Sequence, residues 1–200
     1  MSDRDTAVAI IRQEHRSLRR VVAALQQQLD EIAAGHDEPD FALLGAAVYY
    51  IDEFPERYHH PKEDRHLFKA LRARTPRFND LLDDLQAEHI RSGQTIRYLQ
   101  RALIHYLGGA PTGLKLFSDA VDACATLLED HMHKEEKLLS EACEYLSTED
   151  WREIAAAFKA NEDPMFGNAQ REEFRRLYDR IVNPLPRKPG MSVRREKSRQ

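Results

Sequence analysis

The sequence predicts an all-α protein, arranged as an up-down-up-down four-helix bundle with one or two additional C-terminal helices. Apolar residues recur at intervals of three and four through most of the chain, which is the period of a helix that packs along one face. Only 8 Gly and 9 Pro occur in 200 residues, and they cluster between the periodic segments. Four of these segments are long and the breaks between them are short, as in an antiparallel bundle.

The long helices are expected at residues 6–34, at residues 41–73, between Pro76 and Gly108, and at residues 114–146. Within the second helix, Pro55 and Pro61 must introduce a kink or a loosened turn, because proline lacks the backbone N–H of a regular α-helix. Two shorter helices are expected at about residues 147–160, after a capping-type Ser-Thr-Glu-Asp sequence, and at about residues 169–181.

A chain of this length fits one domain with a substantial apolar core. We expect the bundle at residues 1–146, a helical extension packed on it at residues 147–183, and a basic tail at residues 184–200. Three prolines and six basic residues mark this last segment, which we expect to be a solvated, disordered end.

Composition excludes several classes of protein. The net charge of −4 and the pI near 6.1 give no basic footprint for nucleic acid. Two cysteines cannot form the disulfide framework of a small secreted domain. The chain shows no signal-peptide pattern at its start and no run of the roughly 20 apolar residues that cross a bilayer. We therefore expect a cytoplasmic protein that binds neither membrane nor nucleic acid.

The apolar stripes of all four long helices are interrupted by residues that commonly bind metals. These residues are His15, His59, Glu63, His89, His131 and Glu135. Two of the interruptions are His-x-x-x-Glu pairs, and residues four apart on a helix project from one face. Taken singly, each residue is explained equally well as a hydrogen-bonded core histidine or a surface glutamate. Their joint occurrence on the inward faces of four helices favours a metal site.

Burying a charged glutamate in an apolar seam is costly unless the carboxylate is paired or bound to a cation. Two divalent cations would compensate for it, since two bridging carboxylates neutralise half of a +4 charge. Nitrogen and carboxylate ligands suit iron better than calcium or magnesium, and the lack of cysteine among the candidates argues against a structural zinc cage. Iron is therefore the expected metal, while manganese, zinc or a mixed pair stay open.

These residues resemble the hemerythrin-like family, also called the HHE cation-binding domain. Its hallmark is a His, then His-x-x-x-Glu, then a His, then His-x-x-x-Glu, in that order. The matching stretches are residues 13–16, 59–64, 87–89 and 131–136, and the resemblance covers roughly residues 6–146. It implies two Fe ions in an oxo- or hydroxo-bridged centre, with the six residues above as ligands and with Glu63 and Glu135 as the bridges.

The chain departs from oxygen-carrying hemerythrins near the third-helix ligand. Those proteins place a further histidine one turn away, whereas position 85 is Leu and position 93 is Gly here. One iron is therefore expected to have fewer imidazole ligands, which makes reversible oxygen transport doubtful. His60 is an additional candidate ligand, because Pro61 perturbs the helix beside it. His36, His66, His105 and His133 are expected at the surface.

The leading functional hypothesis is a non-haem di-iron protein that binds or reacts with a small oxidant. O2, peroxide and NO are the candidates, in sensing, detoxification or iron handling; whether there is catalytic turnover is left open. The alternative is a non-catalytic regulatory or interaction module that reports iron or oxygen status to a partner. A third hypothesis is a bundle that retains the residues without binding metal. A homodimer is compatible with the sequence.

Overall fold

The computed structural model describes residues 1–160 and 167–183. All regular elements in these ranges are helical, so the predicted all-α class is confirmed. In chain order they are α1 (Asp3–Ala33), α2 (Phe41–Phe54), η1 (Pro55–His59), α3 (His60–Lys62), η2 (Glu63–Phe68), α4 (Lys69–Arg74), η3 (Pro76–Phe78), α5 (Asn79–Leu107), α6 (Gly113–Ala142), α7 (Thr148–Lys159) and α8 (Gly167–Val182). The predicted basic tail at residues 184–200 lies outside the described residues.

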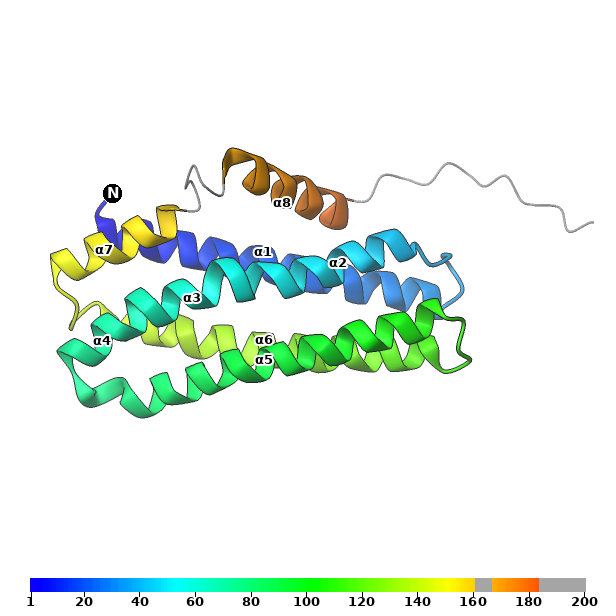
Figure 1. Cartoon of the computed structure of the whole chain (residues 1–200), viewed down its shortest axis with the longest axis horizontal. Helices are drawn as coiled ribbons and strands as arrows, with labels where there is room; N and C mark the ends of the chain where they lie inside the picture. The colour runs from blue at the N-terminus through cyan, green and yellow to red at the C-terminus, as the bar shows by residue number, and fades with distance from the viewer. Residues whose placement is uncertain (161–166, 184–200) are drawn as a thin grey trace, which may run out of the picture.

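Four long rods lie side by side in Figure 1. They are α1, the composite of α2 to α4 (the second rod, residues 41–74), α5 and α6. Successive rods run in opposite directions, with the loops at residues 34–40 and 108–112 at one end of the molecule (Figure 1). α1 packs against α2 and α6, and α5 packs against the same two neighbours. Each rod therefore touches two others around a shared centre.

The ends of α1 and α7 are set by local hydrogen bonds. Ser2 caps α1, since its hydroxyl accepts the N–H of Asp5 at 3.1 Å and the Asp5 carboxylate accepts the N–H of Ser2 at 3.2 Å. Ser147 and Asp150 form the same capping box at α7, where the sequence predicted a helix start. Hydrogen bonds from Arg74 and Ser147 lower the pKa of Asp150 to about 2. The side chain of Arg74 therefore ties α7 to the end of the second rod.

The second rod departs from α-helical geometry at the two prolines, as the sequence predicted. Both η1 and η2 are π-helical turns, and the N–H of His60 donates to the carbonyl of Pro55, five residues earlier. The wider turn accommodates a proline that cannot donate its own backbone bond. His59 and His60 are adjacent in the chain and both buried. In a regular α-helix, consecutive side chains project about 100° apart, so the two adjacent imidazoles would not point at the same place.

The apolar core is divided into two clusters. The α2 cluster includes Leu25, Ile51, Ile96, Phe117 and Val121, and the α7 cluster includes Ile11, Phe68, Leu82, Leu138 and Phe158. The buried polar residues of the four rods occupy positions along the chain between these two clusters. The fold thus places a polar layer across the middle of a long apolar bundle.

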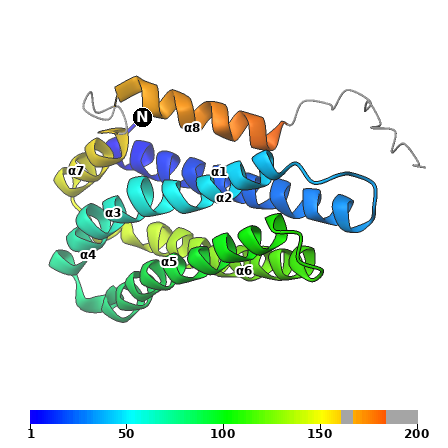
Figure 2. The ribbon, with the colours of Figure 1, turned by 45° about the vertical axis from the view of Figure 1, so that its right-hand side comes forward.

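The two C-terminal helices cover the bundle from outside. α7 packs along α1 and against η2, and its Trp151, Ile154 and Phe158 join the α7 cluster. α8 lies over α1 and α2, as Figure 2 shows from a second direction. Its Ile181 is buried in the α2 cluster. Among the helices of the described ranges, none combines the length and the apolar character that crossing a membrane requires.

Ile96→Ala and Ile104→Ala form a matched pair on α5, since Ile96 is 1% exposed and Ile104 is 67% exposed. Ile96→Ala should lower the free energy of unfolding by about 2–5 kcal/mol, because it opens a cavity in the α2 cluster. Ile104→Ala should change it by no more than about 0.5 kcal/mol. Urea unfolding followed by circular dichroism measures both values, and equal losses would contradict the described packing of α5.

Candidate metal centre

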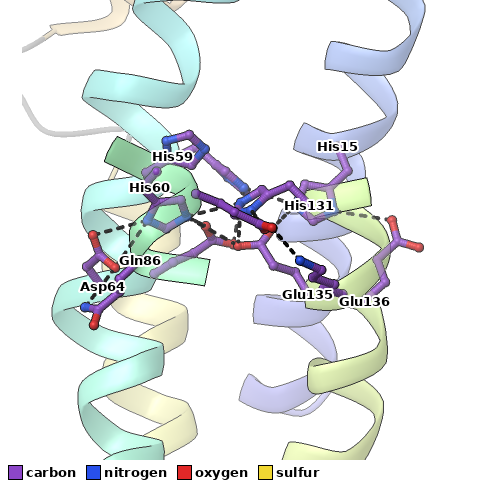
Figure 3. Close-up of polar contacts among 12 residues, drawn as sticks. His15, His59, His60, Asp64, Gln86, His131, Glu135 and Glu136 are labelled. Atoms are coloured by element: carbon purple, nitrogen blue, oxygen red, sulfur yellow. Dashed lines mark hydrogen bonds and ion pairs between the residues drawn. The ribbon is translucent and has the colours of Figure 1, made fainter. Parts of the chain in front are cut away.

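Seven of the predicted site residues converge in the polar layer. His15 comes from α1, His59, His60 and Glu63 from the second rod, His89 from α5, and His131 and Glu135 from α6. All seven side chains are buried. Figure 3 shows His15, His59, His60, His131 and Glu135 pointing toward one another between the helices. The structure thus brings together every residue that the sequence singled out for this site.

The imidazole Nε2 atoms surround the two central carboxylates. Glu135 lies 3.2 Å from Nε2 of His15 and 3.1 Å from Nε2 of His131. Glu63 lies 3.2 Å from Nε2 of His59 and 3.7 Å from Nε2 of His89. Donor atoms gather within 4.8 Å of one another in two overlapping groups: His15, His59, Glu63 and Glu135, and His89, His131, Glu63 and Glu135. Both carboxylates belong to both groups.

Charge interactions dominate the protonation of these residues. Burial lowers the pKa of His59, but the carboxylates of Glu63 and Glu14 outweigh that effect and hold it well above its usual value. In the same way, Asp64, Glu135 and Glu63 raise the pKa of His89 to about 9 against the effect of burial.

The two central carboxylates shift in opposite directions. Burial and the nearby charge of Glu135 raise the pKa of Glu63. Burial alone would also raise the pKa of Glu135, yet His131 and two other imidazoles hold it well below its usual range. The two central carboxylates therefore differ in how readily each loses its proton.

All four carboxylate oxygens of Glu63 and Glu135 are buried and make no hydrogen bond of acceptable geometry. Buried carboxylate oxygens without such a bond cost several kcal/mol unless a cation coordinates them. The donor set of imidazole nitrogens and carboxylate oxygens fits that role. The residues present therefore fit a metal centre.

His60 adds a fifth imidazole beside the second group. Its ring stacks on His89 at a centroid distance of 4.0 Å and meets the ring of His131 edge-on at 5.4 Å. His60, His89 and His131 form a further cluster of candidate metal donors. The Nδ1 atom of His60 lies 3.5 Å from Oε1 of Glu56 and makes no hydrogen bond. An imidazole is thus present beside His89, although Leu85 and Gly93 leave none on α5 itself.

Acids contact the outer sides of four imidazoles; for Glu14, Glu88 and Glu136 the sequence left open a solvated helix face or such a contact, and it did not point to Asp64. The Nδ1–H of His59 donates to Glu14 at 2.8 Å, and that of His131 donates to Glu88 at 3.0 Å. Glu136 lies in the same way beside His15 (Figure 3), and Asp64 lies beside His89. The sequence carries a signal for them, because each of the four acids directly precedes or follows a candidate ligand.

The remaining histidines lie outside this centre. His36, His66, His105 and His133 are exposed, as the sequence predicted. His133 is two residues from His131 on α6 and points away from the site, which makes it a suitable control position.

The family comparison agrees with this geometry. The sequence model of a protein family, described as the hemerythrin HHE cation binding domain, matches residues 6–143. The chain belongs to the hemerythrin HHE cation-binding family. No curated protein matches the chain, and no solved structure does. The matched range of this HHE domain contains nearly all of α1 and the whole of the second rod, α5 and α6, and it includes all seven residues of the centre.

Metal uptake by the metal-free HHE domain should release protons, because imidazoles bind metals in their neutral form. At pH 7 His89, with a pKa of about 9, still carries its proton in the absence of metal. The ring resonances of His89 in the metal-free protein should therefore titrate near pH 9, well above the ordinary value of about 6.5. NMR spectra of the metal-free protein recorded over a series of pH values measure the midpoint. A midpoint near 6.5 would contradict the charge state described for this centre.

Proposed function

We propose that this HHE domain holds two iron ions and that the pair binds or reacts with a small oxidant such as O2, peroxide or NO. In this proposal the domain is an up-down-up-down bundle in which all four rods supply ligands. The observation that carries the proposal is the buried Glu63–Glu135 pair, whose oxygens lie close to imidazole nitrogens without a hydrogen bond of acceptable geometry and belong to two separate groups of imidazoles.

The ligand roles follow from the two donor groups. His15 and His59 would hold one metal, and His89 and His131 the other, with Glu63 and Glu135 shared between them. His60 would join the second metal, since its ring lies against both His89 and His131. The two metals would then have two and three imidazole ligands, which leaves the one beside His15 and His59 with fewer protein donors.

The surrounding side chains exclude bulk water from the centre. Phe158 of α7 meets the ring of His59 edge-on at 6.2 Å, and Phe68 stacks against His89 at 5.8 Å. Phe54 also stacks against His59, at a centroid distance of 6.4 Å. A bound iron pair supplies electrons to an oxidant, and a closed apolar wall limits side reactions of such chemistry. The protein's contribution is thus to hold the donors and keep the site dry.

A second candidate function is metal-dependent regulation, and the position of α7 favours it. Phe158 contacts His59, and its ring also receives the ammonium group of Lys62 at 5.2 Å from the centroid. A movement of His59 on metal binding would therefore change its contact with Phe158, which belongs to a helix outside the four rods. On this alternative, metal occupancy would set the packing of α7 and so report iron or oxygen status to a partner.

Elemental analysis tests the metal. Wild-type protein loaded anaerobically with Fe2+ should contain about two iron atoms per chain. His131→Ala should lower the iron content by about half or more, because it removes a donor from the second group. His133→Ala, on the same helix but outside the centre, should retain the wild-type content. Equal iron in all three samples would contradict the ligand assignment.

Stopped-flow optical spectroscopy tests the reaction. The reduced, iron-loaded protein should develop a charge-transfer absorption band in the near-ultraviolet after mixing with O2 or peroxide, since carboxylate-bridged iron pairs absorb there once oxidised. His133→Ala should behave like wild type, whereas His131→Ala should not give the band. A fully loaded protein that reacts with no oxidant, and whose α7 changes its hydrogen exchange when iron binds, would favour the regulatory function instead.

A further inference from the structure

Each of four imidazoles in the centre makes a contact on its outer side with a carboxylate that is not among the proposed ligands. The distances from Nδ1 to the carboxylate are 3.3 Å for His15 and Glu136, 2.8 Å for His59 and Glu14, 3.3 Å for His89 and Asp64, and 3.0 Å for His131 and Glu88. A carboxylate can only accept, so each Nδ1 must carry the proton. Each Nε2 is then directed toward Glu63 and Glu135.

These four contacts cross four different interfaces between rods. Glu136 reaches from α6 to α1, Glu14 from α1 to the second rod, Asp64 from the second rod to α5, and Glu88 from α5 to α6. Together they form a closed ring around the bundle. Because each acid is next in sequence to a ligand on its own rod, every rod both supplies a metal donor and orients a donor of its neighbour.

Each acid is in turn held by a donor nearer the surface. Arg19 donates to Glu136 at 2.8 Å, Lys134 donates to Glu88, and the ammonium of Lys62 lies 3.9 Å from Glu14. Asp64 instead accepts from the neutral amide of Gln86 at 3.2 Å, and Arg72 donates to that amide's oxygen at 2.9 Å. Three of the acids thus have a cation as their direct partner, and the fourth reaches one through an amide.

We propose that Glu14, Asp64, Glu88 and Glu136 are positioning residues of the metal centre, each holding one imidazole with its Nε2 toward the Glu63–Glu135 pair. This proposal rests on the metal centre proposed above. A histidine that is oriented by an acid binds metal more tightly, because its tautomer is fixed before binding and its nitrogen is more basic. The four acids therefore determine metal affinity without touching the metal.

Glu88 gives the sharpest test, since it joins His131 to Lys134. Glu88→Ala removes the acceptor and the charge, whereas Glu88→Gln keeps an acceptor oxygen and removes only the charge. Asp84→Ala is the matched control, because Asp84 is an exposed acid one turn earlier on α5. Zinc is the probe, since it is redox-inactive and diamagnetic. Its affinity is measured by competition with a chelator, and its stoichiometry on the wild type is measured first.

Glu88→Ala should weaken zinc binding by about 10- to 100-fold, and Glu88→Gln by less. Asp84→Ala should bind zinc as the wild type does. In the zinc-loaded protein, the Nδ1–H of His131 should give a slowly exchanging proton resonance by NMR. That resonance should persist in Glu88→Gln and in Asp84→Ala and vanish in Glu88→Ala, which a general loss of stability would not produce.

Glu136→Ala repeats the test at His15, and it is the variant to use if Glu88→Ala does not fold. Glu136 is partly exposed, and Arg19 keeps a second partner in Glu129 at 2.7 Å, so little else is disturbed. Wild-type zinc affinity in Glu88→Ala or Glu136→Ala, or an equal loss in Asp84→Ala, would overturn the positioning role while leaving the metal centre intact. A wild-type protein that binds no zinc or iron would overturn the metal centre and this role together.

Discussion

Two carboxylates, Glu63 and Glu135, lie at the middle of a long apolar bundle with essentially no exposed surface, and most of the arrangement around them can be understood from the free energy that such burial costs. Five imidazoles surround the pair, a layer of acids surrounds four of these imidazoles, and cations or an amide hold the acids. The sign of charge thus alternates from the centre outward. Each layer makes the burial of the one inside it less costly.

The second rod shows what this arrangement requires of the backbone. An unbroken α-helix can place His59 and Glu63 on one face, but it would turn the adjacent His60 away from them. The prolines at positions 55 and 61 interrupt the regular hydrogen bonding, and the π-helical turns that result bring both histidines inward. The irregularity is therefore part of the site, as is common for single π turns in helices.

The apolar stripes were sufficient to predict the rods, because the apolar residues of a helix that buries one face recur at intervals of three and four residues. α1 and α6 begin and end within about one turn of the expected positions. The breaks in those stripes were sufficient to find four of the buried imidazoles, and the neighbouring Pro61 pointed to His60 as a further candidate. The partners on their outer sides could not be predicted, because they depend on how neighbouring rods cross. Glu14 directly precedes His15 and so projects about 100° away from it, and this angle directs it to His59 on the next rod.

The division of the apolar core has a consequence for how the molecule opens. The α2 cluster and the α7 cluster do not merge into one core, so their apolar side chains meet only through the imidazoles of the polar layer, such as His59, which contacts both Phe54 and Phe158. Without a cation in that layer, the two ends of the bundle are joined by continuous backbone, by these ring contacts and by a ring of acid–imidazole bonds. Each end can then loosen as a separate cooperative unit. A bound metal pair would link the two ends of the bundle, so that they would unfold together.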